Sequence, residues 1–308
     1  MINPVRIGTR ASPLALKQAR MVAEALRNAH GWGPEWIEIV PITTTGDVIQ
    51  DRPLAEVGGK GLWTKELDRA LAEGRTDLSV HSMKDVETIR PEELVIEAML
   101  PRADVRDRLI GAESIDALPH WARVGTSSPR RTAQLLSRRP DLNIVSIRGN
   151  VATRLRRVEM GEADATLLAA AGLERLGQGS VGTVIDDMLP APAQGAIGIE
   201  VAAANTRVRK LVRAIDDRPT HICVAAERRL LEGLGGGCRS PVAGLATLDG
   251  EAILLRAEIL TNDGSEFEAA EIGFSAENRE APLSLARHLL KQASPALRAL
   301  FDGEASSC

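Results

Sequence analysis

Three short stretches of the chain carry residue types that could do chemistry. In EGLGGGCRSPVAG (232–244), one thiol, Cys238, follows three glycines and precedes an Arg-Ser-Pro turn. Consecutive glycines cost ordering entropy and bury nothing, so they suit a loop whose backbone approaches another group closely. The pattern predicts a thiol on a loop tip. By contrast, the apolar neighbours of Cys223 predict a core residue on a helix capped by Thr220 and stopped by Gly233.

The second stretch is rich in arginine. Between Trp121 and Met160, nine arginines oppose only Asp141 and Glu159. Guanidinium groups recognise carboxylate or phosphate bidentately, and a helix N-terminus attracts anions. In VGTSSPRRTAQLL a strand runs into a hydroxyl-rich turn and then a helix, which favours an anion site over a solvated basic turn. Its expected members are Thr126, Ser128, Arg130 and Arg131.

The same logic applies to IRGNVATRLRRVEMG. Arg148 stands at a predicted strand end, where ligands bind in open α/β sheets. Arg154 lies one turn inside the following helix, and Arg175, after AAAGLE, is expected on the same rim. For Arg156 and Arg157, an exposed basic helix face is the favoured interpretation.

The third stretch is DLSVHSMKDVET. A strand over 77–80 leads into a hydroxyl (Ser82), an ammonium (Lys84) and a carboxylate (Asp85). These groups could form a catalytic cluster, or Lys84 and Asp85 could merely pair at the surface, which stabilises little. Upstream, the glycine-bearing loop before a helix near Thr64 is either disordered or a mobile lid.

Short apolar runs alternate with helical patterns, which predicts an α/β fold with parallel sheets. Ser12 and Pro13 begin a helix that Gly31 ends, and a hairpin is expected around 262–264. The Pro-rich stretch 188–195 indicates a hinge. The expected domains are residues 1–100 with 196–215 (α/β), 101–195 (α/β, Arg-rich) and 216–308 (α+β, carrying Cys238).

The composition of the chain limits the classes of protein to which it can belong. The chain has 308 residues, 44% hydrophobic and 26% charged, with a net charge of −4. No run is apolar enough for a membrane span, and Arg6 and Arg10 interrupt any signal-peptide pattern, so we expect a cytoplasmic protein. Three cysteines without metal-ligand spacing indicate neither a disulfide framework nor a metal site. Trp121 is the one aromatic residue of the Arg-rich window, so nucleic acid is a disfavoured partner.

Together these stretches resemble the porphobilinogen deaminase (hydroxymethylbilane synthase) family. The matching motifs run in the family's order over nearly the whole chain: GTRASPLALKQA, GGKGLWTKELD, HSMKDV, GTSSPRR, IRGNVATRL, AAAGLERLG, LPAPAQGAIGIE and GGGCRSPVAG. The resemblance implies two α/β domains like those of periplasmic binding proteins and a smaller C-terminal α+β domain. It implies a monomeric transferase of porphyrin biosynthesis, which joins four porphobilinogens head to tail, releases ammonia and finally releases the linear tetrapyrrole by hydrolysis.

The resemblance also assigns roles to residues. Cys238 would carry a dipyrromethane cofactor through a thioether, and Asp85 would be the catalytic group. Cofactor and substrate would be bound by Arg10, Ser12, Lys60, Trp63, Ser82, Lys84, Thr126, Ser128, Arg130, Arg131, Arg148, Arg154, Arg175 and Gln194. Glu87 follows HSMKDV where the family usually has proline, and this replacement is expected to loosen the loop after that motif. The alternative is a non-catalytic two-lobed anion-binding protein, which gives Cys238 no role.

Overall fold

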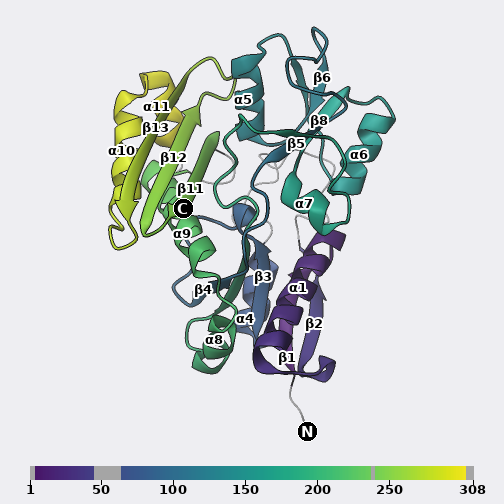
Figure 1. Ribbon diagram of the computed structural model, residues 1–308, viewed down its shortest axis with the longest axis vertical. Helices are drawn as coiled ribbons and strands as arrows, with labels where there is room; N and C mark the ends of the chain where they lie inside the picture. The colour runs from purple at the N-terminus through teal and green to yellow at the C-terminus, as the bar shows by residue number, and fades with distance from the viewer. Residues whose placement is uncertain (1–3, 45–63, 237–239, 303–308) are drawn as a thin grey trace. The chain divides into compact units, whose positions relative to one another are not determined.

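A computed structural model of the chain describes residues 4–44, 64–236 and 240–302 (Figure 1). The chain forms two compact units. The first consists of Met1–Ala103 and Gly195–His221, and the second of Asp104–Gln194 and Ile222–Cys308. The second unit holds two separate sheets. The division into three domains at the boundaries given above stays a prediction.

The first unit is built on a five-stranded sheet, in the order β2-β1-β3-β10-β4. Its strands are β1 (Val5–Arg10), β2 (Ile37–Ile42), β3 (Leu78–Ser82), β4 (Leu94–Met99) and β10 (Ile197–Ala202). Strand β1 pairs in parallel with β2 and β3, whereas β10 runs antiparallel to β3 and β4. The expected parallel pairing is thus confirmed for β2, β1 and β3, and β10 is the reversed strand of this sheet. Strand β10 comes from a distant part of the chain, after residue 194.

Helices cover both faces of this sheet. They are α1 (Pro13–His30), α4 (Lys65–Ala72) and α8 (Thr206–Arg213), with short 3-10 turns η1 (Pro34–Trp36) and η2 (Met83–Asp85). Successive strand residues point to opposite faces. Accordingly, Ile37 and Ile39 of β2 pack with α1 and α8, whereas Val40 and Ile42 pack with α4.

The start and end predicted for α1 are confirmed. The Ser12 side chain accepts a hydrogen bond from the Ala15 N–H at 3.3 Å, and Pro13 opens the helix. Gly31 ends it with φ +65°, a conformation that glycine adopts without steric cost. This cap matters for the site because Ser12 lies only two residues after Arg10, the last residue of β1.

The second unit contains a sheet of the same pattern, in the order β7-β6-β8-β5-β9. Its strands are β5 (Asp107–Ile110), β6 (Arg123–Gly125), β7 (Asn143–Val145), β8 (Ala165–Ala169) and β9 (Thr183–Ile185). Strands β7, β6 and β8 are parallel, and β5 is the reversed strand. The accompanying helices are α5 (Pro129–Arg138), α6 (Val151–Glu159) and α7 (Ala170–Arg175). Strands β5 and β9 were not predicted.

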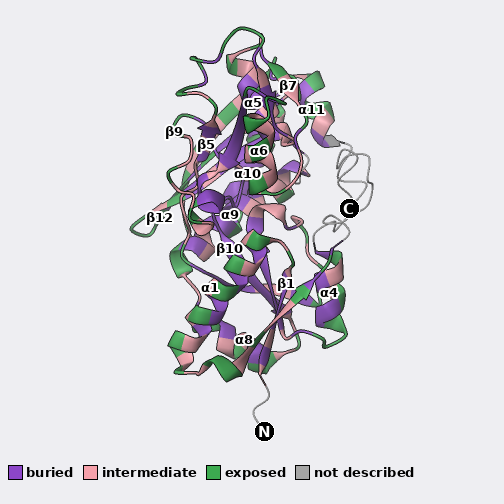
Figure 2. Cartoon of the chain, turned by 90° about the vertical axis from the view of Figure 1, so that its right-hand side faces the viewer, coloured by how far each residue is buried: buried purple, intermediate pink, exposed green. Residues whose placement is uncertain are grey.

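The C-terminal part of the second unit is an α+β structure in which one layer of helices packs on a three-stranded sheet. A meander of β11 (Val242–Asp249), β12 (Ala252–Leu260) and β13 (Phe267–Ser275) packs with α9 (Arg218–Leu234), α10 (Ala281–Gln292) and α11 (Pro295–Asp302). The hairpin expected around 262–264 joins β12 to β13. In β12, Ile253 and Leu255 face the helices whereas Leu254 is exposed, as expected of a sheet with one covered face. Figure 2 colours the chain by the burial of each residue.

The bounds predicted for the Cys223 helix were wrong. Helix α9 begins before Thr220, because Asp217 Oδ2 accepts the hydrogen bond of the Thr220 N–H at 3.0 Å and so provides the cap. The helix continues through Gly233 to Leu234. The position of Cys223 in the core is confirmed, since it is 6% exposed.

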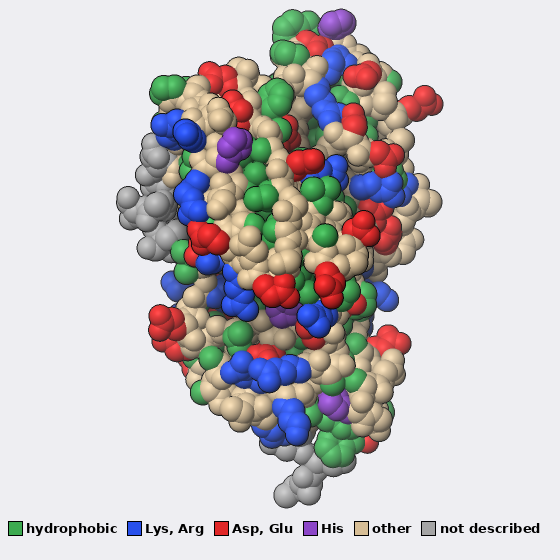
Figure 3. All heavy atoms as spheres, turned by 60° about the vertical axis from the view of Figure 1, so that its left-hand side comes forward, with side chains coloured by type: hydrophobic (Ala, Val, Ile, Leu, Met, Phe, Trp, Pro, Cys, Tyr) green, Lys and Arg blue, Asp and Glu red, His purple; other side chains and the backbone are tan. Residues whose placement is uncertain are grey.

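The observed architecture confirms the predicted α/β class with a smaller C-terminal α+β part. None of the helices within the described ranges has the length and apolar character to cross a bilayer. On the face in Figure 3, acidic and basic side chains are interspersed.

Candidate active site

In the first unit, the candidate residues follow neighbouring parallel strands. Arg10 is the last residue of β1 and Ser82 the last of β3, and Asp85 ends the 3-10 turn η2 that follows β3. Because β1 and β3 are parallel partners, their carboxyl ends lie at the same edge of the sheet. This edge is where ligands bind in open α/β sheets.

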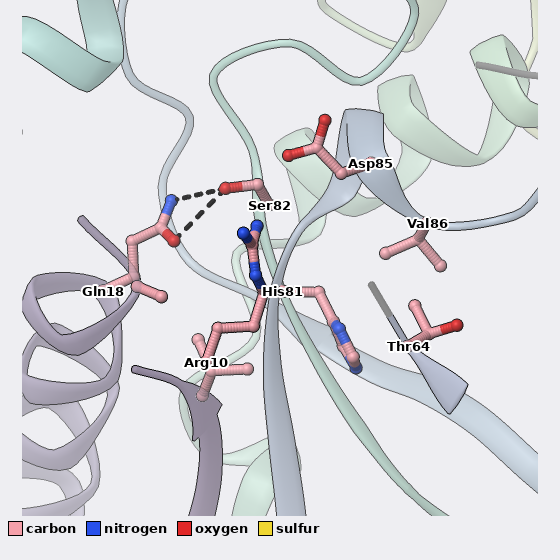
Figure 4. Close-up of a pocket in the computed structure, with 9 residues that line it drawn as sticks. Arg10, Gln18, Thr64, His81, Ser82, Asp85 and Val86 are labelled. Carbon is pink, nitrogen blue, oxygen red and sulfur yellow. Dashed lines mark hydrogen bonds between the residues drawn. The ribbon is translucent and has the colours of Figure 1, made fainter. Parts of the chain in front are cut away.

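A small, open pocket lies at this edge (Figure 4). It brings together three residues that the sequence singled out, Arg10, Ser82 and Asp85. The remaining lining residues were not predicted: Ala15, Gln18, Thr64, Val80, His81 and Val86. A guanidinium, a hydroxyl and a carboxylate thus line one small concave site.

Gln18 is the most informative of the residues that the sequence analysis missed. It is only 2% exposed, and its amide Nε2 lies 2.8 Å from Ser82 Oγ and its Oε1 3.2 Å from the same atom. Figure 4 shows this amide and hydroxyl pointing toward each other, with both hydrogen bonds dashed. A signal was present, because Gln18 shares the apolar face of α1 with Ala15, Ala19 and Val22. A polar residue on such a face must find a buried partner.

The Asp85 carboxylate is half-buried and lines the pocket. Within residues 4–44, 64–236 and 240–302, no hydrogen bond or ion pair engages it, and no pair with Lys84 forms. Lys84 is half-buried on the same turn. The simple surface pair that could explain these two residues is therefore not observed, and the Asp85 carboxylate can accept a ligand's N–H groups.

In the second unit, a comparable set follows the parallel strands β6, β7 and β8. Thr126 and Ser128 come after β6, Arg148 after β7, and Arg175 ends α7, which follows β8. Ser128 caps α5 by accepting the Arg131 N–H at 3.4 Å, and Thr126 Oγ1 accepts the Ser128 N–H at 3.2 Å. The topology again gathers hydroxyls and cations at the carboxyl edge of a sheet.

Two of these cations have unusual surroundings. Arg175 is largely buried, and burial lowers its pKa to about 10 even though Glu174 acts in the opposite direction. Arg154 Nε donates to the Gly149 carbonyl at 3.0 Å. Both side chains suit an anionic ligand, which would restore the interactions that burial removes.

Arg130 and Arg131 meet an anion that the protein itself supplies. Both are buried, and their guanidinium groups lie 2.7 Å from Asp107 Oδ2 and Oδ1 respectively. Although burial favours the neutral acid, the two positive charges hold the pKa of Asp107 well below its usual value. Gln194 Nε2 also donates to Asp107 Oδ1, at 2.9 Å. Contact of these arginines and Gln194 with a ligand stays a prediction.

This arrangement predicts a large stability effect. Asp107→Asn would leave two buried guanidinium groups without their counter-charge, so the free energy of unfolding should fall by about 3–5 kcal/mol. The exposed Arg123–Asp164 pair gives a matched control, since Asp164→Asn should cost less than about 1 kcal/mol. Urea unfolding followed by circular dichroism measures both. Equal losses would contradict the structural role of Asp107.

Some candidates lie elsewhere. Lys60, Trp63 and Cys238 fall outside the described residues, and Ser12 caps α1 without lining the pocket. In the described part of the chain, no group of three or more His, Cys, Asp or Glu side chains could hold a metal ion.

Comparison with known proteins gives consistent matches. Residues 5–210 match the family model "Porphobilinogen deaminase, dipyromethane cofactor binding domain", and residues 221–291 match "Porphobilinogen deaminase, C-terminal domain". The porphobilinogen deaminase of Sphingopyxis alaskensis is 55% identical over 307 residues, covering 97% of both chains. That of Paracoccus denitrificans is 52% identical over 293 residues, covering 93% of this chain and 94% of the relative.

Solved structures match more weakly. The second Venus-flytrap domain of Bordetella pertussis BvgS is 16% identical with a TM-score of 0.40, over 74% of this chain and 91% of that one. A reconstructed ancestral cationic amino acid binding protein is 16% identical with a TM-score of 0.44, over 68% of this chain and 86% of that one.

Proposed function

The chain belongs to the porphobilinogen deaminase family, and we propose that it is a hydroxymethylbilane synthase. It joins four porphobilinogens head to tail on a covalently bound dipyrromethane, releases one ammonia for each, and then releases the linear tetrapyrrole by hydrolysis. The observation that carries the proposal is the pocket at the carboxyl edge of the first sheet, where the Asp85 carboxylate lies with Arg10 and Ser82.

Asp85 is suited to the chemistry of this condensation. Ammonia leaves the aminomethyl carbon of porphobilinogen with assistance from the pyrrole nitrogen, so positive charge develops on the ring. A fixed carboxylate beside the pyrrole N–H stabilises that charge where it forms. The same carboxylate can accept the proton that the new ring junction loses when aromaticity returns. Arg10 and the Ser82 hydroxyl can bind the acetate and propionate groups of the substrate.

The donor set of the second unit fits a dipyrromethane, which carries acetate and propionate groups of its own. Thr126, Ser128, Arg148, Arg154 and Arg175 follow the parallel strands of one sheet and supply hydroxyls and cations for carboxylates. When bound, the dipyrromethane supplies the free pyrrole position to which the first porphobilinogen is joined. We assign its attachment to Cys238, because the glycines before this thiol suit a loop that must admit a bulky group.

The decisive experiment is turnover of purified protein with porphobilinogen. One ammonia should appear for each porphobilinogen consumed, and the product should be the linear tetrapyrrole. The alternative, a non-catalytic anion-binding protein, predicts binding without ammonia release. Because one chain carries every group named here, no second copy is needed for turnover, and we propose a monomer.

The arginines should differ in their effects. Arg148→Ala removes a charged contact at a strand end and should weaken binding of carboxylate-bearing substrate by roughly 1.5–3 kcal/mol. Arg138 is the matched control, because it ends α5 and pairs with the exposed Asp187. Arg138→Ala should leave KM for porphobilinogen unchanged.

Arg139→Ala should also keep activity but lose stability, since Arg139 donates to the carbonyls of Ile115 and Leu118. Steady-state kinetics on cofactor-loaded protein tests the three variants. A loss of activity in Arg138→Ala as full as in Arg148→Ala would contradict this division.

A further inference from the structure

A buried ionic network adjoins the pocket of the first unit, and the proposed chemistry does not use it. At its centre is Arg90, whose side chain is 9% exposed. Its Nε lies 2.8 Å from Glu200 Oε1 on β10, and its Nη1 lies 2.7 Å from Glu87 Oε2. Its Nη2 lies 2.5 Å from Asp68 Oδ1 on α4. One guanidinium group therefore joins carboxylates from three separate segments.

The network contacts the pocket wall at two points. His81 Nε2 lies 3.0 Å from Glu200 Oε2, and the Thr64 hydroxyl donates to Glu87 Oε1 at 2.9 Å. Both His81 and Thr64 line the pocket with Asp85. Glu87 was expected to loosen this segment, but its carboxylate is instead held by Thr64 and Arg90.

The groups of this network hold one another in their charged forms. Burial works against the charged form of Arg90, yet its bonds to Glu200 and Asp68 raise its pKa above the usual value. Burial likewise opposes ionisation of Glu200, but His81 and Arg90 lower its pKa to about 2. Burial raises the pKa of Asp68. Removing the Arg90 guanidinium group would thus leave its partner carboxylates without a counter-charge in a poorly solvated place.

The geometry links this network to Asp85. On the N-terminal side of Asp85, His81 of β3 is hydrogen-bonded to Glu200. On the C-terminal side, Glu87 is hydrogen-bonded to Arg90. Between them, the Val86 N–H donates to the Met83 carbonyl at 3.3 Å and closes η2. Both ends of the segment 81–87, which carries Asp85, are therefore attached to one buried network.

We propose that Arg90, acting through Glu87 and Glu200, is a positioning residue that fixes the Asp85 carboxylate in the pocket. The proposal rests on the function proposed for Asp85, because position matters only if that group meets the reacting atoms. A catalytic group displaced by about 1 Å can lose up to 100-fold in rate.

The first test compares Arg90→Lys and Glu87→Gln with a control. Both variants should lower kcat per cofactor-loaded molecule roughly 10–100-fold with little change in KM, because position rather than binding is altered. The control is Arg209→Lys, since Arg209 Nε lies 2.7 Å from the buried Glu97 and Arg209 does not line the pocket. It should keep kcat. Full kcat in both test variants, even with a lowered melting temperature, would overturn the proposal.

A double-mutant cycle isolates the route of action. If Glu87 acts through the position of Asp85, then Glu87→Gln should lower kcat much less in an Asp85→Glu background than in the unaltered chain. Additive effects would mean that Glu87 acts elsewhere and would contradict the proposal.

Hydrogen exchange gives a readout that needs no substrate. Amides of residues 82–87 should exchange faster in Arg90→Lys and in Glu87→Gln, but not in Arg209→Lys. Unchanged exchange of these amides in both Arg90→Lys and Glu87→Gln would contradict the positioning role, even if the enzyme turns over porphobilinogen. Faster exchange in a chain that lacks this turnover would instead place the failure in the proposed function.

Discussion

Cys238→Ala is expected to remove the covalent adduct and all turnover. The chain would then lack the attachment point for the dipyrromethane, so porphobilinogen would have no tethered acceptor and successive additions could not stay at one centre. Intact mass spectrometry measures the adduct, and ammonia release measures turnover on the same sample.

The other two cysteines are the controls. Cys223 is 6% exposed in the core that packs α9 against the C-terminal sheet, and Cys308 is the last residue. Cys223→Ala and Cys308→Ala should keep both adduct and turnover. Active protein with the mass of the bare chain would falsify the assignment to Cys238. An adduct that persists in Cys238→Ala and vanishes in Cys223→Ala would move the attachment to the buried thiol.

Local signals predicted the local structure well. Ser12, Pro13 and Gly31 fixed both ends of α1, because capping depends on residues only a few positions apart. The end of the strand predicted over 77–80 made Ser82 and Asp85 candidates, the family resemblance added Arg10, and these three residues line one pocket.

Long-range pairings were not predictable from these signals. Asp107 lies on β5, a short strand with no clear pattern, and it meets Arg130 and Arg131 only after β5 pairs with β8 in reverse. The arginines at the start of α5 predicted a site for an anionic ligand, which stays a prediction, but the sequence did not show that Asp107 pairs with both of them. The fit of Gln18 to Ser82 is of the same kind, since a helix face meets a strand end only in the fold.

Asp85→Asn is expected to keep the fold and retain cofactor while kcat falls by about 100–1,000-fold, the usual effect of removing one fixed group from a developing charge. The amide has nearly the shape of the carboxylate but lacks its charge, so it cannot stabilise the pyrrole cation. Asp85→Glu should keep measurable turnover, because the charge remains while its position shifts. Steady-state turnover on protein whose loading is confirmed by mass spectrometry gives both values.

The structure provides a control variant for this prediction. Two other carboxylates near Asp85 in the sequence have partners: Asp77 Oδ1 lies 3.1 Å from Arg6 Nη2, and Asp104 Oδ2 lies 2.8 Å from Arg106 Nη2. Asp85 has no such partner among the residues that the structure describes, and it lines the pocket. Asp77→Asn should therefore leave kcat per loaded molecule intact while weakening the fold. Near-normal turnover of loaded Asp85→Asn, or a loss in Asp77→Asn as large as in Asp85→Asn, would move the catalytic role away from Asp85.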